Sequence, residues 1–220
     1  MRQDYTVKPI FPVNTYLFTA PKALTADTLE KAKQLPYKSF NEPYGVGTSH
    51  DIHKYEQFQD LHRWFQQCVD TIHKDNGWTC DRIVVNKSWV NRSDAGTLHR
   101  HDAHRHPMSY LSGIYYLTEG PPTVFLDPID KREWQQFHLD GGPYTETRIF
   151  CHPGAGNLVI FPSWLIHASV ENDSDIDRYT IAFNTFPQGD LNSGGWDLPM
   201  ARVKVDGWAE LGPLNLNDYA

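Results

Sequence analysis

Several features that would assign a function at once are scarce or missing in this chain of 220 residues. It has three cysteines, and none of them forms a CxxC pair, so the sequence indicates neither a zinc ribbon nor a disulfide framework. No apolar run is long enough to span a membrane, and the amino-terminal stretch lacks the apolar core of a signal peptide. These absences predict a reduced, soluble, cytoplasmic protein with no membrane partner.

Long basic runs are missing as well. The chain has 20 lysines and arginines against 27 acidic residues, a formal net charge of -7, which argues against a nucleic-acid partner. No glycine-rich phosphate loop or dinucleotide fingerprint opens a helix, and no G-x-S-x-G nucleophile elbow is present. The composition therefore favours a small-molecule or peptide substrate.

What is present is a globular composition, with 40% hydrophobic and 13% aromatic residues. The length suits a single domain over residues 1–220. We expect a helical amino-terminal layer over 1–80, a β-rich core over 81–186 and a carboxy-terminal extension over 187–220. The sequence leaves a homodimer open.

Two helices are expected in the amino-terminal layer. Asp27, with Glu30 three residues later, forms a capping-box pattern that predicts the start of the first helix at Asp27. The second helix is predicted by apolar residues three or four positions apart and by a stop at Asn76-Gly77. Its apolar stripe comprises Phe58, Leu61, Phe65, Cys68 or Val69, and Ile72.

Short strands are expected after residue 80. Seven stretches are rich in β-branched and aromatic residues and are bounded by Gly, Pro or Asp. A helical layer followed by many short strands is typical of a sandwich, a barrel or a jelly roll braced by helices. The stretches are 82–91, 109–118, 123–128, 147–153, 157–162, 166–170 and 178–186.

Four of the eleven histidines stand within LHRHDAHRHP, residues 98–107. Residues two apart in a strand point to the same face, so His104 and His106 are one candidate pair of metal ligands, and His99 and His101 are another. His167, after an apolar strand, is a candidate third ligand. Imidazole binds iron, zinc, copper and nickel alike, and a polar loop rich in histidine is the alternative interpretation.

Arg178 opens the apolar strand RYTIAFN, an unusual place for a residue that is seldom buried without a partner. Alternation puts it on one face with Thr180, Ala182 and Asn184. That face would suit a pocket in which the guanidinium binds a carboxylate through two hydrogen bonds. A salt bridge to one of the aspartates that precede the strand is the simpler interpretation.

These motifs occur in a fixed order that resembles the Fe(II)/2-oxoglutarate-dependent dioxygenases. The resemblance covers residues 83–186, and the ordered set is specific although no single motif is. It implies a mainly β fold, a double-stranded β-helix or jelly roll with the helices packed on one sheet. It also implies Fe(II) and 2-oxoglutarate as cofactors and hydroxylation as the default reaction. The motifs are WVN at 89–91, HRHP at 104–107, SGIYYL at 112–117, FPSWLIH at 161–167 and RYTIAFN at 178–184.

One departure from the family pattern concerns the metal ligands. Most of the superfamily use H-x-D and a distant histidine, but the histidine-rich segment at 98–107 contains no H-x-D. The resemblance implies His104, His106 and His167 as the ligands, with His106 at the aspartate position. Asp102, from the adjacent loop, is the alternative third ligand. His99 and His101 would then not bind the metal. They would support the ligands, contact the substrate or face solvent.

The same resemblance implies residues for the keto acid. Arg178 would bind its distal carboxylate, and Tyr116 would place a hydroxyl beside the arginine, since alternation puts Tyr116 and Ser112 on one face of their strand. Asn91 and Asn184 are further candidate contacts, or they satisfy backbone groups. Three rivals are a cupin-like metalloenzyme that uses no 2-oxoglutarate, a zinc hydrolase and a non-catalytic β-sandwich.

Overall fold

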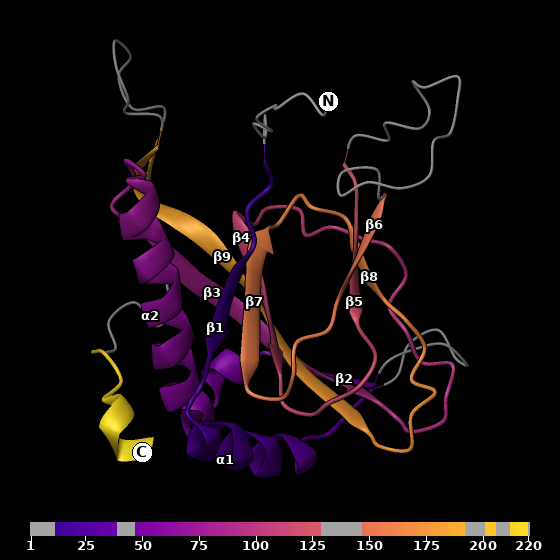
Figure 1. Ribbon diagram of the computed structural model, residues 1–220. Helices are drawn as coiled ribbons and strands as arrows, with labels where there is room; N and C mark the ends of the chain where they lie inside the picture. Colours follow the sequence, from indigo (N-terminus) through magenta and orange to yellow (C-terminus); the bar gives the residue numbers. More distant parts are fainter. Residues whose placement is uncertain (1–11, 39–46, 129–146, 192–200, 206–211, 220) are drawn as a thin grey trace, which may run out of the picture.

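The computed structural model describes residues 12–38, 47–128, 147–191, 201–205 and 212–219. Two antiparallel sheets pack face to face (Figure 1). In the described residues the larger sheet has seven strands in the order β1 (Tyr16–Thr19), β7 (Asn157–Pro162), β4 (Leu111–Tyr116), β9 (Arg178–Leu191), β3 (Arg82–Ser93) and β2 (Gly47–His50), with β10 (Ala201–Val203) beside β9. The smaller sheet has the order β6 (Arg148–Cys151), β5 (Thr123–Leu126) and β8 (His167–Ser169).

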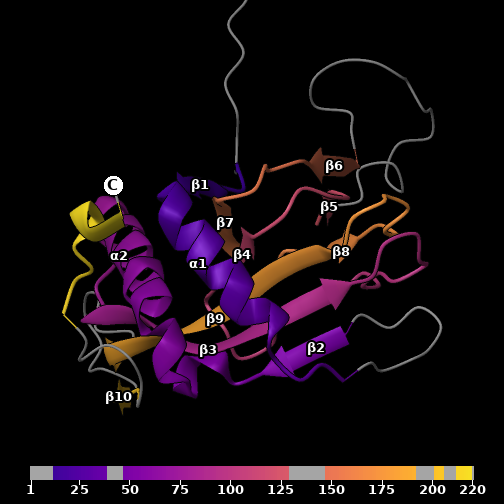
Figure 2. The same ribbon diagram turned by 90° about the horizontal axis from the view of Figure 1, so that it is seen from below.

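Both α-helices lie on the outer face of the larger sheet (Figure 2). They are α1 (Lys22–Lys33) and α2 (Gln59–Asn76), and the described residues also include 3-10 turns at Ile52–Lys54, Glu56–Phe58 and Leu216–Tyr219. The main core lies between the helices and the sheet, where the ring of Phe65 packs 4.7 Å from that of Phe183. A second cluster joins the two sheets and contains Tyr116, Phe125 and Phe161. The jelly roll with helices on one sheet is confirmed.

Most predicted elements are confirmed. Each of the seven predicted strand stretches contains a strand, β3 to β9. The predicted stripe of α2 is buried, and the helix ends at Gly77, which takes the left-handed conformation (φ 62°) that favours glycine. The alternation within β9 is confirmed too, since Tyr179, Ile181 and Phe183 pack in the core beneath the helices.

Three predictions about boundaries were wrong. Helix α1 begins at Lys22 after Pro21, so Asp27 is an interior residue that pairs with Lys31 at 2.6 Å instead of capping the helix. The layer predicted as helical also contains β1 and β2, strands of four residues each that have little room for a repeating pattern. Strand β9 continues to Leu191, beyond the predicted end at residue 186, because β10 and the start of β3 pair with its extension.

A bulge in β3 decides which side chains of this strand face the smaller sheet. The register with β9 shifts between Val85 and Lys87. Before the shift, Ile83 and Val85 point into the core beneath the helices, and after it Val90 does. The extra residue therefore turns Lys87 and Trp89 toward the opposite face, as a bulge does when it changes the phase of a strand.

None of the helices in the described part of the chain is long and apolar enough to cross a membrane.

Candidate metal and cosubstrate site

The histidine-rich segment lies along β8 as an irregular edge of the smaller sheet. His104 and His167 exchange both backbone hydrogen bonds, at 2.9 and 3.0 Å. The amide of His106 donates to the carbonyl of Ser163 at 3.0 Å, and the amide of Ser169 donates to the carbonyl of His101 at 3.1 Å. The regular strand assumed for the H-x-H pairs was wrong, because the segment pairs with β8 at isolated positions only.

This pairing brings three imidazoles together. One ligand atom from each of His104, His106 and His167 lies within 4.8 Å of the others. The ring centroids of His104 and His167 are 4.4 Å apart, and those of His106 and His167 are 5.1 Å apart. The set implied by the resemblance is therefore one cluster, with ligands from two segments that are far apart in the sequence.

The direction of each ring follows from its hydrogen bonds. The Nδ1 atom of His104 lies 2.7 Å from the carbonyl oxygen of Asp102, and that of His167 lies 3.0 Å from the carbonyl oxygen of Leu165. A carbonyl only accepts, so both Nδ1 atoms carry the hydrogen and both Nε2 atoms keep a free lone pair. The Nε2 of His106 is buried without a hydrogen-bond partner among the described residues.

A chain of buried hydroxyl groups supports His106 from behind. The side chain of Asn184 hydrogen-bonds the His106 ring, and the Ser112 hydroxyl donates to Asn184 Oδ1 at 2.9 Å. Ser112 lies 2.8 Å from the hydroxyl of Ser163, which donates to Ser109 at 2.8 Å. Sequence reasoning assigned no role to these three serines, since an isolated serine carries no signal of its own.

Arg178 is 4% exposed, and its Nε has no partner among the described residues. Its guanidinium carbon lies 5.5 Å from the centre of the Tyr116 ring. The salt bridge to a preceding aspartate does not form in the described part of the chain, where Asp177 pairs with Arg92 at 3.1 Å. Burial lowers the pKa of Arg178, and the neighbouring Tyr116 offsets this effect only in part.

A glycine makes room for the buried arginine. Gly120 has φ of 150°, and a Cβ there would lie 3.2 Å from Cδ of Arg178. Below the arginine, the Tyr116 hydroxyl lies 2.5 Å from that of Thr123. Burial raises the pKa of Tyr116 to about 12, so this hydroxyl keeps its hydrogen near neutral pH.

The remaining candidates occupy distinct places. Asp102 does not join the cluster: its side chain is 93% exposed and lies 3.6 Å from Arg100. His99 accepts from the amide of Asp94 at 3.4 Å, away from the cluster. Asn91, on the same face of β3 as Trp89, accepts from the Thr48 hydroxyl at 3.2 Å.

His101 lies between the cluster and the arginine. Burial, together with the positive charges of His104, Arg178 and His106, lowers its pKa to about 4. Its ring centroid is 5.9 Å from that of His104. Sequence reasoning grouped His101 with His99, but only His101 faces the interior of the jelly roll.

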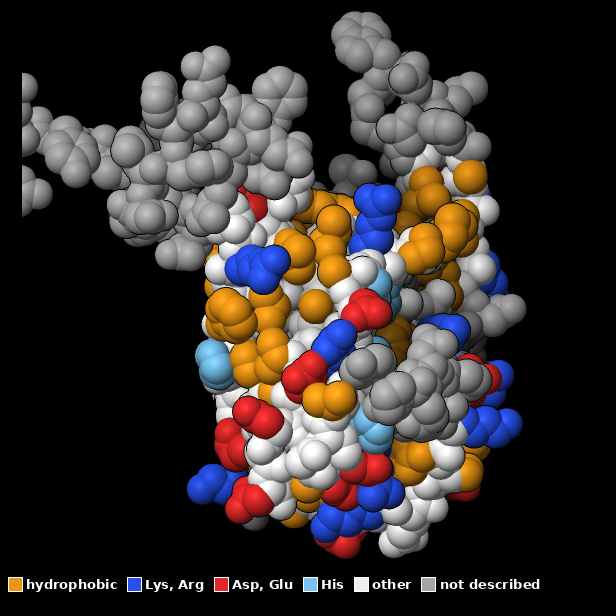
Figure 3. Space-filling model, turned by 90° about the vertical axis from the view of Figure 1, so that its right-hand side faces the viewer, with side chains coloured by type: hydrophobic (Ala, Val, Ile, Leu, Met, Phe, Trp, Pro, Cys, Tyr) orange, Lys and Arg blue, Asp and Glu red, His pale blue; other side chains and the backbone are white. Residues whose placement is uncertain are grey.

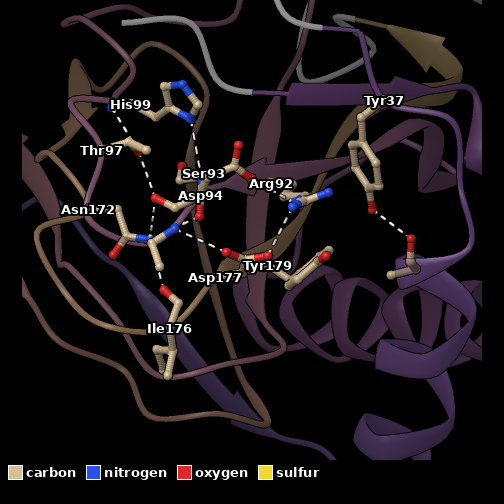
Figure 4. A network of polar contacts seen from close by, with 12 residues as sticks. Tyr37, Arg92, Ser93, Asp94, Thr97, His99, Asn172, Ile176, Asp177 and Tyr179 are labelled. Carbon is tan, nitrogen blue, oxygen red and sulfur yellow. Dashed lines mark hydrogen bonds and ion pairs between the residues drawn. The ribbon is translucent and has the colours of Figure 1, made fainter.

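The start of the histidine segment is held by a buried polar network (Figure 4). The side-chain amide of Asn172 donates to the carbonyls of Ser93, Asp94 and Ile176 at 2.9 to 3.1 Å. The backbone of Thr97 donates to the carbonyl of Asn172 at 3.0 Å. These bonds join the end of β3 to the loop before β9, so that the segment begins from a fixed point.

Comparisons with known proteins agree with this geometry. Residues 87–184 match the family described as "Putative 2OG-Fe(II) oxygenase". The matched stretch contains the three clustered histidines and Arg178. A comparison with curated protein sequences found no significant match.

Solved structures share the fold of this protein at low sequence identity. The epimerase SnoN from nogalamycin biosynthesis has a TM-score of 0.64 at 11% identity, over 88% of this chain and 92% of SnoN. EctD from S. alaskensis, solved with 2-oxoglutarate and 5-hydroxyectoine, has a TM-score of 0.62 at 15% identity, over 92% of this chain and 85% of EctD. A Pseudomonas putida prolyl-4-hydroxylase has a TM-score of 0.59 at 13% identity, over 80% and 94% of the two chains.

The residues of this site fit Fe(II) and 2-oxoglutarate, the two cofactors of the matched family. Neutral imidazole is the form that binds a metal. Burial, with the charges of the neighbouring histidines, lowers the pKa of His167 to about 3 and that of His106 to about 4, so both are neutral at pH 7. The lone Nε2 of His106 is the orphaned buried atom that a metal would satisfy. The guanidinium of Arg178, whose Nε also has no partner among the described residues, fits a carboxylate of the keto acid in the same way.

Figure 3 shows the face of the protein on the side of β5, β6 and β8, where histidine side chains lie among charged ones. Hydrophobic side chains gather on the upper part of this face. The exposed hydrophobic residues of the described chain include Ile149 and Phe150 on β6 and Trp164 in the turn before β8.

Proposed function

We propose that this protein is a 2OG-Fe(II) oxygenase that hydroxylates a small molecule or a peptide. In this proposal His104, His106 and His167 hold Fe(II), and Arg178 binds the distal carboxylate of 2-oxoglutarate with Tyr116 beside it. When bound, the two cofactors supply oxidation by dioxygen, in which the keto acid loses CO2 to become succinate. The protein supplies ligand geometry, an anchor for the keto acid and a pocket beside the metal position.

The observation that carries the proposal is the buried charge of Arg178, whose Nε has no partner among the described residues. A guanidinium that is 4% exposed, without an acidic partner in the described part of the chain, is costly in the free protein. A bound carboxylate would repay that cost through two charge-assisted hydrogen bonds. A cupin-like enzyme that uses no keto acid gives this residue no such role.

Of the two candidate asparagines, Asn184 supports the ring of His106 in this proposal. Asn184 hydrogen-bonds the ring of His106 and is itself fixed by Ser112, so in this proposal it orients a metal ligand. Asn91 remains a candidate for a contact inside the pocket, at the same face of β3 as Trp89.

The size of the pocket supports a small substrate. The cavity beside His104 and His106 has a volume of about 330 Å³, at the lower end of the range for small-molecule sites. Two proteins of the same fold are a prolyl-4-hydroxylase and EctD, crystallised with a hydroxylated product. Both support hydroxylation of a compact group as the reaction.

Succinate formation tests the proposal. The protein is loaded with Fe(II) without oxygen, 2-oxoglutarate is added, and succinate is measured after air is admitted. We expect slow succinate formation even without substrate, its loss in His167→Ala, and its retention in the matched control His99→Ala. Iron binding without any binding or turnover of 2-oxoglutarate would overturn the proposal and favour the cupin-like enzyme.

A further inference from the structure

The mouth of the cavity beside His106 is basic. Besides two histidines of the cluster, its lining includes His50 on β2, Lys87 on β3 and Arg105 from the histidine segment. None of the described residues that line it is acidic. In a chain with a formal net charge of -7, a pocket mouth with two full positive charges is a local exception.

Neither of these cations is neutralised within the described residues. Lys87 and Arg105 take part in none of the ion pairs or hydrogen bonds found there, whereas Arg100, on the same segment as Arg105, pairs with Glu171. The nearby Asp51 forms its ion pair with Lys54, at 3.3 Å, and has only a longer-range charge interaction with Lys87. Both charges are therefore available to a ligand.

The fold aims Lys87 at the pocket. The bulge between Val85 and Lys87 turns this side chain away from the helices, and the β3–β9 register sets it opposite Asn184. Asn184 in turn hydrogen-bonds His106. The lysine is therefore the cross-strand neighbour of a residue that contacts a proposed metal ligand. Arg105 immediately precedes the same histidine in the chain. The two cations thus flank the proposed metal position from two different elements.

The keto acid does not account for these charges. Its distal carboxylate is assigned to Arg178, which is buried between the sheets at the start of β9, whereas Lys87 and Arg105 are exposed at the mouth. A second anionic group is needed to match them. A fork-shaped guanidinium and a flexible ammonium together suit an oxyanion, either a carboxylate or a phosphate.

We infer that the substrate of this oxygenase carries a carboxylate or phosphate group, which Lys87 and Arg105 bind at the pocket mouth while the carbon to be oxidised lies beside the histidine cluster. The inference rests on the proposed function, because it takes the cavity as the substrate site. The pair would also attract an anionic substrate from a distance, an effect that salt screens.

Paramagnetic relaxation tests the inference without a known substrate. The protein is loaded with Fe(II) and 2-oxoglutarate under anaerobic conditions, and the probes are inorganic phosphate, followed by ³¹P resonance, and acetate, followed by ¹H resonance. We expect at least one probe to bind saturably near the iron. The double variant Lys87→Gln/Arg105→Gln should bind it at least tenfold more weakly. The matched control Lys22→Gln/Lys74→Gln, two exposed lysines on the helices, should bind it as the wild type does.

The outcomes separate the two sources and the two proposals. Tighter binding of phosphate supports a phosphorylated substrate, and tighter binding of acetate supports a carboxylate. Equal relaxation in the wild type and the double variant, which is expected for an anion bound to iron alone, overturns the inference. The absence of relaxation with both probes also overturns it. The absorption of the Fe(II)–2-oxoglutarate complex is recorded in each sample. If it is present, only the inference fails; if the wild type lacks it, the proposed function fails and the inference with it.

Discussion

The indole ring of Trp89 lies stacked against the imidazole ring of His106, with centroids 5.5 Å apart and planes 19° apart. The ring of His167 is also parallel to that of His106, with planes 19° apart. Trp89 comes from β3, just beyond the bulge, and His106 from the segment beside β8. The contact therefore sets the orientation of a proposed metal ligand by joining the two sheets.

Loss of this contact should weaken the metal site. Replacement of Trp89 by alanine leaves one side of the His106 ring unsupported, and we expect iron affinity to fall about tenfold, as for other residues that orient a ligand. Trp89→Phe keeps an aromatic face and should stay within about threefold of the wild type. The measurement is a competitive titration with a chelator. Trp78→Ala is the control, since Trp78 packs on Tyr110 with centroids 5.0 Å apart. Equal iron affinity in Trp89→Ala and the wild type would contradict the role.

The third ligand can be assigned by metal content. His106→Ala should lose most of the bound iron, because it removes one of three imidazoles, whereas Asp102→Ala should keep it, because that side chain is 93% exposed. His106→Asp recreates the common 2-His-1-carboxylate set and should still bind iron. Iron is measured after gel filtration by atomic emission. Loss of iron in Asp102→Ala with retention in His106→Ala would reverse the assignment.

Arg178 should govern affinity for the keto acid and not for the metal. Removal of two charge-assisted hydrogen bonds, each worth roughly 1.5–3 kcal/mol, should weaken 2-oxoglutarate binding at least about 100-fold in Arg178→Ala. Arg178→Lys restores the charge without the fork and should fall between. Binding is followed by the charge-transfer absorption of the anaerobic Fe(II) protein, and iron content is the control. The assignment does not survive if Arg178→Ala binds the keto acid as tightly as the wild type.

The folded protein should lose stability as the pH falls, partly because of a histidine far from the metal site. His62 is fully buried, with Nδ1 2.7 Å from the carbonyl oxygen of Phe58 and Nε2 2.6 Å from the hydroxyl of Ser88. Burial lowers its pKa from 6.5 to about 4. The unfolded chain therefore takes up a proton at a higher pH than the folded one. The lowered pKa of His62 contributes up to about 3 kcal/mol to the free energy of unfolding. This contribution is complete above pH 6.5 and is lost as the pH falls toward 4.

Comparison with a variant isolates this effect from the other histidines. The free energy of unfolding is measured in urea from pH 7.5 to 4.5 for the wild type and His62→Leu. The variant should be less stable at pH 7, because the hydroxyl of Ser88 loses its partner, and its stability should fall less steeply with acid. Parallel curves for the two proteins would show that His62 does not titrate with a lowered pKa.

The elements that a local pattern could predict are those with a long regular repeat. The stripe of α2 and the alternation of β9 gave the faces of Phe65 and Arg178 correctly, because each pattern extends over several turns or residue pairs. The capping box at Asp27 was misleading, because the proline at position 21 and the residues after it form a helix start that competes with it. Strands β1 and β2 are held by long-range partners, which a local window does not contain.

The three histidines that cluster could be predicted from the sequence, but the residues that support them could not. The histidines and Arg178 stand out because their chemistry is unusual for their position. By contrast, the hydroxyl chain through Ser112, the three carbonyls that Asn172 binds and the separate places of His99 and His101 depend on which segments pair across the sheets. Common residue types gain these roles from tertiary structure alone, so one sequence does not mark them.

The backbone pairing of His104 with His167 also makes the metal position a removable cross-link. The two residues stand about sixty positions apart in the chain, and a shared ion would close that loop at a rung where hydrogen bonds already hold both strands in register. An ion that binds the folded but not the unfolded chain stabilises it in proportion to the logarithm of its free concentration. The thermal stability of this protein would therefore depend on the concentration of free metal. Depletion of iron would shorten the lifetime of the folded protein as well as abolish its activity.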